Sequence, residues 1–412
     1  MTTKTNDQKI LKFFFIIMAL NGLALGLSDS LFSVYFSESY MIDAFQRGLI
    51  EIPRETPGIF IVLIISVLSF WGNLKLAIFA NILSAVSILI LGIFTPLTMP
   101  FNIMLIFLFI NSVGMHMFMP VGDSLTLSVA SKGSLGSIMG KFRGTGTAFG
   151  MIAAILVFFG FRFNVFSFAP DAPIRWPFII SGAAFIGVII MLCLVKRIGK
   201  DLSKTSKTKF IIRKEYTLFY IIAMLFGVRK QIMFVFGPWV LIELLGFGAD
   251  TLAILSIVGA AIGIFFIPAV GKWIDKFGTG KVMAFEAAAF IVVFTAYGIL
   301  SAGLAPGGFI ANVTALILFF VFALKTLDIM SIQFGLVRSV YLRTIALHED
   351  EVAPTLALGM SLDHILTIVS AVFCGWLWTT FGPMYVFFFA ALLAVGNMIV
   401  ARKISKNEKK VA

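Results

Sequence analysis

The sequence predicts an all-α integral membrane protein with twelve transmembrane helices in two pseudo-symmetric six-helix bundles and both termini in the cytoplasm. Three observations predict this class. Of the 412 residues, 60% are hydrophobic and only 13% are charged, whereas soluble domains are about 25% charged. The mean hydropathy is +1.03. Apolar stretches of about 20 residues, the length that crosses a bilayer, alternate with short polar segments.

The expected spans follow one another with little sequence between them, which leaves no room for a soluble domain. The first continues apolar through Phe36 without an A-x-A-like cleavage site, so it is predicted to be a retained helix and not a signal peptide. Each span is long enough to cross with some tilt. They are expected at residues 11–36, 45–70, 74–95, 101–127, 138–161, 174–195, 216–244, 250–270, 280–302, 308–334, 353–378 and 382–401.

A basic segment divides the chain. Residues 196–214 hold eight Lys and Arg and four Ser and Thr, a composition typical of a cytoplasmic linker. The predicted domains are therefore an N-terminal six-helix bundle at 1–195, the linker at 196–214, and a C-terminal six-helix bundle at 215–412.

The distribution of basic residues sets the predicted orientation. The net charge is +12, yet only Arg47, Arg162 and Arg175 lie on the expected outer side. Apart from four basic residues deep within spans, the remaining Lys and Arg lie on the expected inner side. Cytoplasmic loops carry such an excess. The asymmetry predicts a multi-pass protein of the cytoplasmic membrane, and it accounts for the basic charge without a nucleic-acid partner.

Neither a metal site nor a cofactor site is predicted. Cys193 and Cys374 lie in spans of opposite halves, so they support no disulfide and no metal-ligand spacing, and we expect them to be packing residues. No grouping of nucleophile, base and orienting residue stands out, and no loop is long enough for a catalytic domain. The chain is therefore not expected to be an enzyme.

The second expected span contains Glu51, Arg54 and Glu55 together with Pro53 and Pro57. A charge near the bilayer centre costs roughly 2.5 to 3.5 kcal/mol on insertion scales, so such residues usually face a partner, a substrate or a water-filled cavity. The i+3 and i+4 spacings place the three charges on one face, and the prolines are expected to kink the helix. Glu51 can neutralise Arg54, which would leave Glu55 for function.

Four basic residues at depth are the candidates for substrate binding. Arg229 and Lys230 are adjacent, so they point about 100 degrees apart on a helix. One is expected to meet the substrate or acidic residues, and the other to pair across the bundle. Lys325 has Asp328 three residues on, which permits an internal ion pair as readily as a substrate contact. The set is Arg54, Arg229, Lys230 and Lys325.

The candidates for proton coupling are acidic or imidazole groups at depth. Burial raises the pKa of a carboxyl group toward physiological pH, and histidine titrates near pH 6.5. Each candidate also has a structural interpretation, as an ion-pair partner or as a neutral packed histidine. The set is Asp29, Glu55, His116, Asp363 and His364.

Two further features concern gating and packing. Asp123, near the cytoplasmic end of its span, can pair with Arg143 to form a gate, and helix capping is the alternative. The patterns Gly22-x-x-x-Gly26, Gly140-x-x-x-Gly144 and Gly146-x-x-x-Gly150 permit close helix approach and are interpreted as packing.

One loop carries a family signature: Gly271-Lys-Trp-Ile-Asp275-Lys276-Phe-Gly278-Thr-Gly-Lys281. It fits G-x-x-x-D-[RK]-x-G, the loop motif of the major facilitator superfamily, and the chain resembles that family in topology as well. The resemblance implies a conformational latch, with Asp275 accepting from a helix N-terminus or pairing with a cation.

The chain departs from the family pattern in three places. The first-half loop copy is reduced to Gly72-Asn73-Leu-Lys75 and lacks the acid. The fourth helix has no arginine, and His116 is its nearest titratable group. The fifth helix lacks a Gly-Pro pair. Phe45-Gln-Arg47-Gly and Ser361-Leu-Asp363-His364 are similar to segments of uncharacterised bacterial members.

The leading functional hypothesis is a monomeric secondary active transporter that moves a small polar, anionic or zwitterionic solute by alternating access, coupled to protons as a symporter or antiporter. Its expected partners are the small-molecule substrate, H+ and the lipid bilayer. Basic groups at depth favour an anion, because arginine clamps carboxylate or phosphate. Proton-driven efflux of amphipathic or cationic compounds is the first alternative, and a non-transporting membrane sensor is the second.

Overall fold

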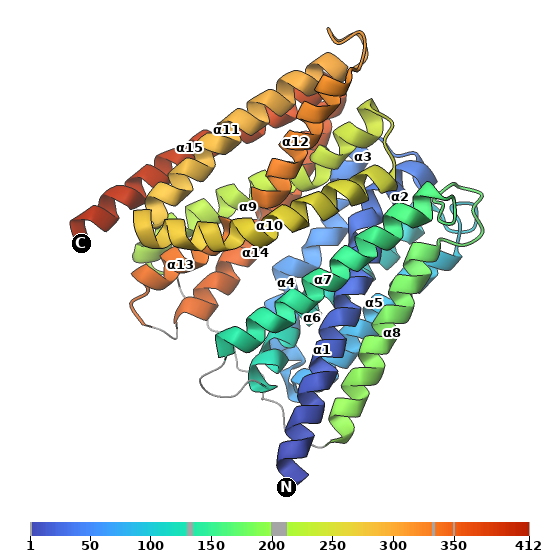
Figure 1. Cartoon of the computed structure of the whole chain (residues 1–412), viewed down its shortest axis with the longest axis vertical. Helices are drawn as coiled ribbons and strands as arrows, with labels where there is room; N and C mark the ends of the chain where they lie inside the picture. The colour runs from blue at the N-terminus through green and yellow to red at the C-terminus, as the bar shows by residue number, and fades with distance from the viewer. Residues whose placement is uncertain (1, 130–134, 199–211, 332–333, 349–350, 412) are drawn as a thin grey trace. The chain divides into compact units, whose positions relative to one another are not determined.

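The computed structural model describes residues 2–129, 135–198, 212–331, 334–348 and 351–411, and these residues form helices and no strand (Figure 1). The chain divides into two compact units. Unit 1 comprises residues 1–41 and 60–208, and unit 2 comprises residues 42–59 and 209–412. Most of the predicted linker at 196–214 lies outside the described residues, and the division into two six-helix bundles stays a prediction.

In unit 1, α1 packs against α7 and α8, and α5 packs against α6 and α8 (Figure 1). The first helix runs without a long loop into a 3-10 turn and a short second helix. The elements are α1 (Thr2–Ser28), η1 (Asp29–Leu31), α2 (Phe32–Tyr40), the second half of α4 (Glu51–Val67), η2 (Ser69–Trp71), α5 (Asn73–Ile93), α6 (Phe101–Val129), α7 (Leu135–Arg162) and α8 (Trp176–Arg197).

Small residues let α1 and α7 approach closely. A Cβ atom at Gly22 would overlap the backbone carbonyl of Gly146, and one at Gly26 would come within 3.3 Å of the backbone of Gly150. This confirms the packing interpretation of those two glycine patterns. A Cβ atom at Gly144 would have no neighbouring atom within 4 Å, so the third pattern makes no such contact there.

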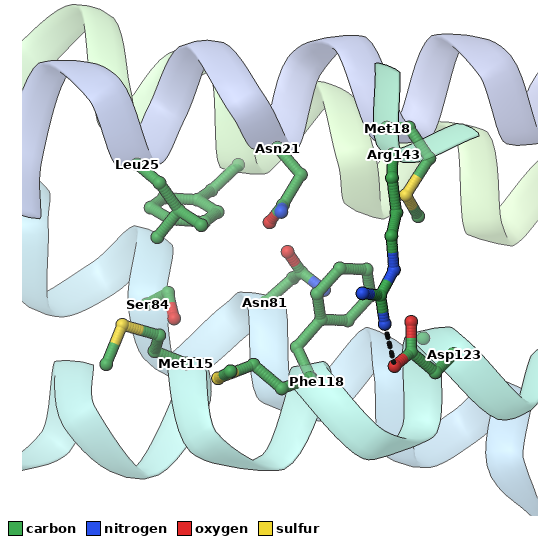
Figure 2. A pocket seen from close by; sticks show the side chains of 12 residues that line it. Met18, Asn21, Leu25, Asn81, Ser84, Met115, Phe118, Asp123 and Arg143 are labelled. Atoms are coloured by element: carbon green, nitrogen blue, oxygen red, sulfur yellow. Dashed lines mark hydrogen bonds and ion pairs between the residues drawn. The ribbon is translucent and has the colours of Figure 1, made fainter. Parts of the chain in front are cut away.

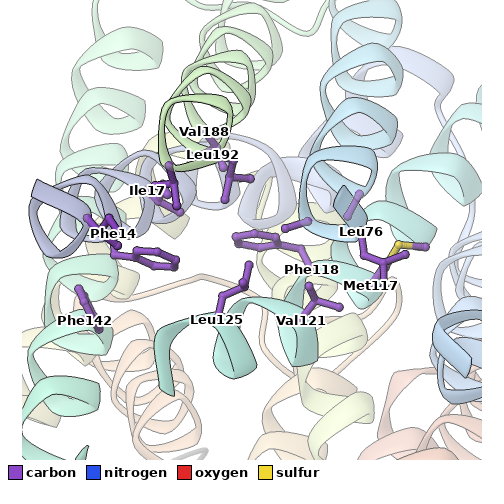
Figure 3. Close-up of a cluster of buried hydrophobic side chains, with 14 residues drawn as sticks. Phe14, Ile17, Leu76, Met117, Phe118, Val121, Leu125, Phe142, Val188 and Leu192 are labelled. Carbon is purple, nitrogen blue, oxygen red and sulfur yellow. The ribbon is translucent and has the colours of Figure 1, made fainter. Parts of the chain in front are cut away.

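The core of unit 1 joins five helices through buried side chains (Figure 3). Phe14 from α1, Leu76 from α5, Met117 from α6, Phe142 from α7 and Val188 from α8 are each at most 1% exposed. Lipid tails are as apolar as these side chains, so close van der Waals packing is what holds the helices together.

In unit 2, α11 packs against α15, α14 packs against α9 and α3, and α10 packs against α12. The chain leaves α9 through one turn of π-helix. The elements are α3 (Ala44–Leu49), the first half of α4, η3 (Lys214–Tyr216), α9 (Thr217–Trp239), η4 (Val240–Leu244), α10 (Ala249–Phe277), α11 (Thr279–Leu304), α12 (Ala315–Ser331), α13 (Gly335–Ile345), α14 (Val352–Phe381) and α15 (Pro383–Val411).

The signature loop is a sharp corner between α10 and α11. Gly278 has φ of +81°, a conformation that side chains disfavour. The backbone N–H groups of Thr279 and Gly280 donate to the carboxylate of Glu408 at 3.1 Å each, and the Thr279 hydroxyl donates at 2.5 Å. Glu408 therefore has the role at this helix N-terminus that was expected of Asp275. Asp275 is exposed in the last turn of α10.

Among the described residues, nine helical segments are long and apolar enough to cross a membrane. The expected spans at 45–70 and 308–334 are missing from these because α4 and α12 have 17 residues each. The eighth expected span, at 250–270, lies within α10, whose first part, Ala249–Gly263, is apolar. The count of twelve therefore stays a prediction. Both cysteines are free, but Cys193 is exposed, so only the buried Cys374 is a packing residue.

Candidate functional site

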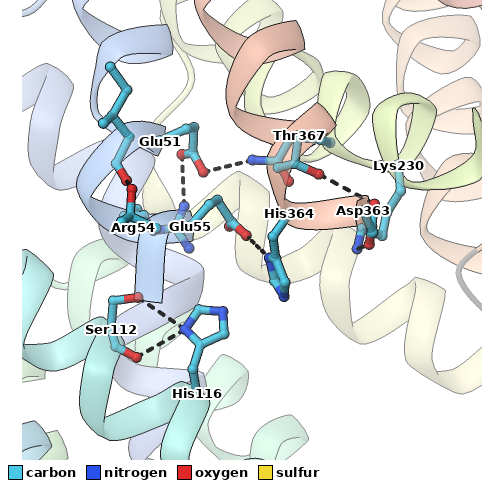
Figure 4. Close-up of polar contacts among 12 residues, drawn as sticks. Glu51, Arg54, Glu55, Ser112, His116, Lys230, Asp363, His364 and Thr367 are labelled. Atoms are coloured by element: carbon cyan, nitrogen blue, oxygen red, sulfur yellow. Dashed lines mark hydrogen bonds and ion pairs between the residues drawn. The ribbon is translucent and has the colours of Figure 1, made fainter. Parts of the chain in front are cut away.

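A carboxylate in the first turn of α4 organises one polar cluster of unit 2 (Figure 4). Glu51 Oε1 accepts from Arg47 at 2.5 Å and from Arg54 at 2.9 Å, and its Oε2 accepts from Gln231 Nε2 of α9 at 2.7 Å. All four side chains are buried. The predicted pair of Glu51 with Arg54 is present. Arg47, which the sequence places on the outer side, is fully buried against Glu51 one turn later.

The helix geometry differs from expectation at one proline. Pro53 lies in the first turn of α4, where a helix tolerates proline because that N–H has no helical partner. Only Pro57 lies in the helix interior. Pro57 therefore remains as the residue that interrupts the hydrogen bonds of α4, two residues after Glu55.

Glu55 and His364 form the closest acid–imidazole contact of unit 2. Glu55 Oε2 lies 2.6 Å from His364 Nδ1 of α14, and both side chains are largely buried (Figure 4). A Cβ atom at Gly58, one turn after Glu55, would lie 2.6 to 2.7 Å from the imidazole ring. The absence of a side chain at Gly58 therefore makes room for His364 against α4.

Lys230 and Asp363 form a second contact between α9 and α14. Lys230 Nζ lies 3.3 Å from Asp363 Oδ2, and the Thr367 hydroxyl donates to Asp363 Oδ1 at 3.4 Å (Figure 4). The Lys230 side chain is 35% exposed, against 2% for that of Arg229. Of these adjacent basic residues, Lys230 is the one that other molecules can reach.

Arg229 belongs to a buried cluster with Glu286 of α11 and Arg338 of α13. Glu286 accepts from Arg229 at 2.6 Å and from Arg338 at 3.4 Å. The guanidinium carbons of Arg229 and Arg338 lie 4.8 Å and 3.1 Å from the ring centroid of Phe226. Among the described residues, Arg229 Nε and Nη1 and Arg338 Nη2 are buried without a hydrogen-bond partner. Two cations thus share one carboxylate.

Sequence reasoning missed the two other charged residues of this cluster. Glu286 lies inside the expected span at 280–302, so the rule that selects charges at depth could have found it. Arg338 falls just beyond the expected span at 308–334, where the charge distribution assigns it to the cytoplasmic side. The structure buries it instead, with 6% exposure, because the carboxylate of Glu286 is within reach.

The remaining predicted residues of unit 2 form a local pair. Lys325 Nζ donates to Asp328 Oδ2 at 2.9 Å and to the carbonyl oxygen of Met233 at 3.1 Å. Both charged side chains are more than 90% buried. This is the internal ion pair that the i+3 spacing permits.

Asp29, His116, Asp123 and Arg143 are the predicted residues that belong to unit 1. Asp29 begins η1. His116 Nδ1 lies 2.9 Å from the carbonyl oxygen of Ser112, which can only accept a hydrogen bond. Asp123 Oδ2 lies 3.3 Å from Arg143 Nη2, with side-chain exposures of 53% and 73%. That predicted pair is present, and its gating role stays a prediction.

The family model described as Major Facilitator Superfamily matches residues 14–345. No curated protein sequence matches the chain.

Solved structures share the fold at low sequence identity. The nucleoside transporter NupG, as a D323A mutant, is 14% identical with a TM-score of 0.74, covering 96% of this chain and 99% of that one. A POT family transporter in complex with a thioalcohol-conjugated peptide is 10% identical, with a TM-score of 0.71 and coverage of 98% and 96%. A D-xylose–proton symporter is 14% identical, with a TM-score of 0.67 and coverage of 96% of each chain.

Proposed function

The chain belongs to the major facilitator superfamily, and from this membership we propose a secondary active transporter of a small anionic or zwitterionic solute, driven by protons. It is a multi-pass membrane protein, and we place it in the cytoplasmic membrane as a monomer. The related folds named above carry nucleosides, bind a peptide or move xylose with protons. They support a small polar cargo without specifying its charge.

The observation that carries the anion proposal is the pair of arginines on one carboxylate. Among the described interior residues of α9 and α11 to α14, the basic groups are Arg229, Lys230, Lys325 and Arg338. The acids that pair with them are Glu286, Asp328 and Asp363. One positive charge is therefore left over. A buried charge without a counter-charge is expensive, and an anionic solute would lower that cost.

Lys230 is the residue that we propose contacts the solute. Its ammonium group is partly exposed and lies 3.3 Å from Asp363, a separation at which a competing carboxylate or phosphate can replace the aspartate. Arg229 and Arg338 stay buried in their ion pairs with Glu286, and their surplus positive charge contributes to the electrostatic potential at the site. Lys325 and Arg54 are already held by internal acids, so we assign them to that potential and not to direct contact.

Glu55 and His364 are the proposed proton carrier. The carboxylate of Glu55 and the imidazole of His364 lie 2.6 Å apart, a hydrogen-bonding distance across which a proton can pass from one group to the other. Asp363 couples this pair to the solute, because it precedes His364 in α14 and accepts from Lys230. When solute displaces Asp363 from Lys230, the released carboxylate becomes available to a proton.

The solute proposal is tested in proteoliposomes that contain a trapped pH indicator. Amino acids, dicarboxylates and sugar phosphates are compared with neutral xylose and adenosine for the ability to move protons. We expect an anionic or zwitterionic solute to move protons and so to change the signal of the trapped pH indicator. Lys230→Gln should weaken its apparent affinity about 10- to 100-fold, the value of a charge-assisted hydrogen bond. The exposed Lys403→Gln on α15 is the matched control.

Other outcomes would point elsewhere. A signal from neutral solutes alone, or unchanged affinity in Lys230→Gln, contradicts the anion proposal. Proton movement with lipophilic cations would favour efflux. Saturable binding with no gradient-driven accumulation would favour a sensor.

Coupling is tested separately with Glu55→Gln and His364→Ala. Both variants should lose the dependence of uptake on the pH gradient while solute exchange at equal pH continues. Glu215→Gln, an exposed acid of the same unit, is the control. Gradient dependence in both variants equal to that of the wild type would rule out this pair as the carrier.

A further inference from the structure

Unit 1 contains a cavity that the transport proposal does not use. It has a volume of about 290 Å³ and lies among α1, α5, α6, α7 and α8 (Figure 2). That volume is close to the lower end of small-molecule sites, which is about 300 Å³. Its wall has polar and apolar parts. The lining residues include the polar Asn21, Asn81 and Ser84 and the apolar Met18, Leu25, Met115, Phe118 and Phe185.

Asn81 carries a buried acceptor without a partner. Its side chain is 1% exposed, and its Nδ2 donates to the carbonyl oxygen of Ala77 at 2.8 Å. Its Oδ1 has no hydrogen-bond partner among the described residues. Figure 2 shows the amides of Asn81 and Asn21 facing each other across the cavity. A buried carbonyl left unpaired costs free energy, so this oxygen is suited to receive a donor from a ligand.

The charges at the cavity cancel. Arg143 and Asp123 line one end and pair with each other at 3.3 Å (Figure 2). No other charged residue is among those that line the cavity in the described part of the chain. An ion entering the cavity would lose hydration without gaining a counter-charge. The cavity therefore favours an uncharged ligand.

The apolar wall favours a flat ring. Phe118 and Phe185 provide aromatic surface, and the thioethers of Met18 and Met115 make favourable contacts with aromatic edges. Methionine side chains also adapt to the outline of a ligand.

We propose that this cavity binds a small uncharged heteroaromatic amide, whose N–H donates to Asn81 Oδ1 while its ring packs between the phenylalanines and methionines. Asn21, on the opposite wall, meets the second polar atom of the amide. The site belongs to unit 1 alone and requires neither the charged clusters of unit 2 nor transport.

The test uses the full chain purified in detergent and two probes of matched size, nicotinamide and methyl nicotinate. Both are uncharged pyridines, but only nicotinamide has an amide N–H donor. Dissociation constants are measured by ligand-observed NMR titration. We expect the wild type to prefer nicotinamide about 5- to 10-fold, the effect of one neutral hydrogen bond. Asn81→Leu removes the hydrogen-bond acceptor and nearly keeps the side-chain volume. This variant should lose the preference for nicotinamide and still bind methyl nicotinate.

Asn397→Leu is the matched control. Asn397 is 7% exposed on α15, and its Oδ1 also has no partner among the described residues, but it does not line the cavity. This variant should keep the wild-type preference. Gly122 of α6 lines the cavity, so Gly122→Val should fill part of it and weaken the binding of both probes.

Gel-filtration profiles and unfolding temperatures establish that each variant is folded. The proposal is overturned if nicotinamide does not bind saturably, if the wild type binds both probes equally, or if Asn81→Leu keeps the preference. Because binding needs no gradient, loss of the solute or proton proposals for unit 2 leaves this measurement unaffected.

Discussion

Glu286 is the carboxylate that forms ion pairs with both Arg229 and Arg338. Glu286→Gln would leave two buried cations without a carboxylate. Removing one partner of a buried ion pair costs about 3 to 5 kcal/mol. We therefore expect a large fall in the thermal unfolding temperature of the detergent-purified protein.

Arg338→Met provides the matched comparison, because it removes the surplus cation and leaves Arg229 paired with Glu286. It should destabilise less than Glu286→Gln does, and the double variant should regain part of the loss. If Glu286→Gln unfolds at the wild-type temperature, the cluster is not the buried charge imbalance described above.

A second residue-scale prediction concerns Glu351, just before α14. The Tyr216 hydroxyl donates to it at 2.5 Å and Arg213 pairs with it, and these contacts hold the pKa of this carboxyl below its usual range. The unfolded chain then takes up the proton first, at about pH 4.3. The resulting stability is present above that pH and is lost as the pH falls through the lower, folded pKa.

Unfolding temperatures of the wild type and Glu351→Gln, measured between pH 3 and 7, check this. The wild type should be the more stable at pH 7, and the difference should shrink as the pH falls below the ordinary glutamate pKa of about 4.3 and through the lower pKa of the folded state. A difference that stays constant with pH would contradict the charge-based explanation.

Residue-level prediction from sequence succeeded where partners are local. The i+3 spacings of Glu51 with Arg54 and of Lys325 with Asp328 predicted contacts that the structure contains. It failed for Glu286 and Arg338, because Glu286 pairs with Arg338 and with Arg229 across 52 and 57 residues. Spacing along one helix carries no information about such distant partners.

At the scale of elements, the fit of α4 against α14 depends on Gly58. The ring of His364 occupies the space that a Cβ atom would take. Gly58→Ala should push the imidazole away from Glu55 and so remove the gradient dependence of uptake, although no titratable group is changed. The measurement is the coupling assay in proteoliposomes. Gly144→Ala, on a helix with open space at that position, should behave as the wild type does.

A Gly58→Ala variant with intact coupling would mean that the contact of Glu55 with His364 is dispensable. An unfolded variant would be recognised by its gel-filtration profile, and Gly58→Ser then serves as a second probe, because its hydroxyl can bond the displaced ring.

Helices were predictable from apolar length, but their interruptions were not. The first expected span at 11–36 includes the 3-10 turn at Asp29–Leu31, and α9 ends in a π-helical turn at Val240–Leu244. Both deviations occur inside apolar sequence, where hydropathy is uniform. Tertiary packing determines where these interruptions of the helices occur, and the hydrophobic periodicity of a single sequence does not reveal that packing.

At the scale of the whole molecule, the excess of Lys and Arg on one side predicts that both termini are cytoplasmic. A green fluorescent protein fused to the C-terminus should fluoresce, and alkaline phosphatase inserted at Asp171, in the loop between α7 and α8, should be active. Fusion of alkaline phosphatase in the 199–211 segment should be inactive. The reverse pattern of activities would invert the proposed orientation.

The clamp that Glu408 forms on the start of α11 has a practical consequence for anyone handling this protein. Glu408 lies close to Ala412 in the sequence, so a purification tag attached after Ala412 begins within a few residues of the clamp. We expect a bulky tag at that position to disturb the bonds that Thr279 and Gly280 donate to Glu408. A tag at the opposite end of the chain leaves the hydrogen bonds of Glu408 unchanged. Comparing the activity of the protein with the two tag placements then shows how much these bonds contribute to it.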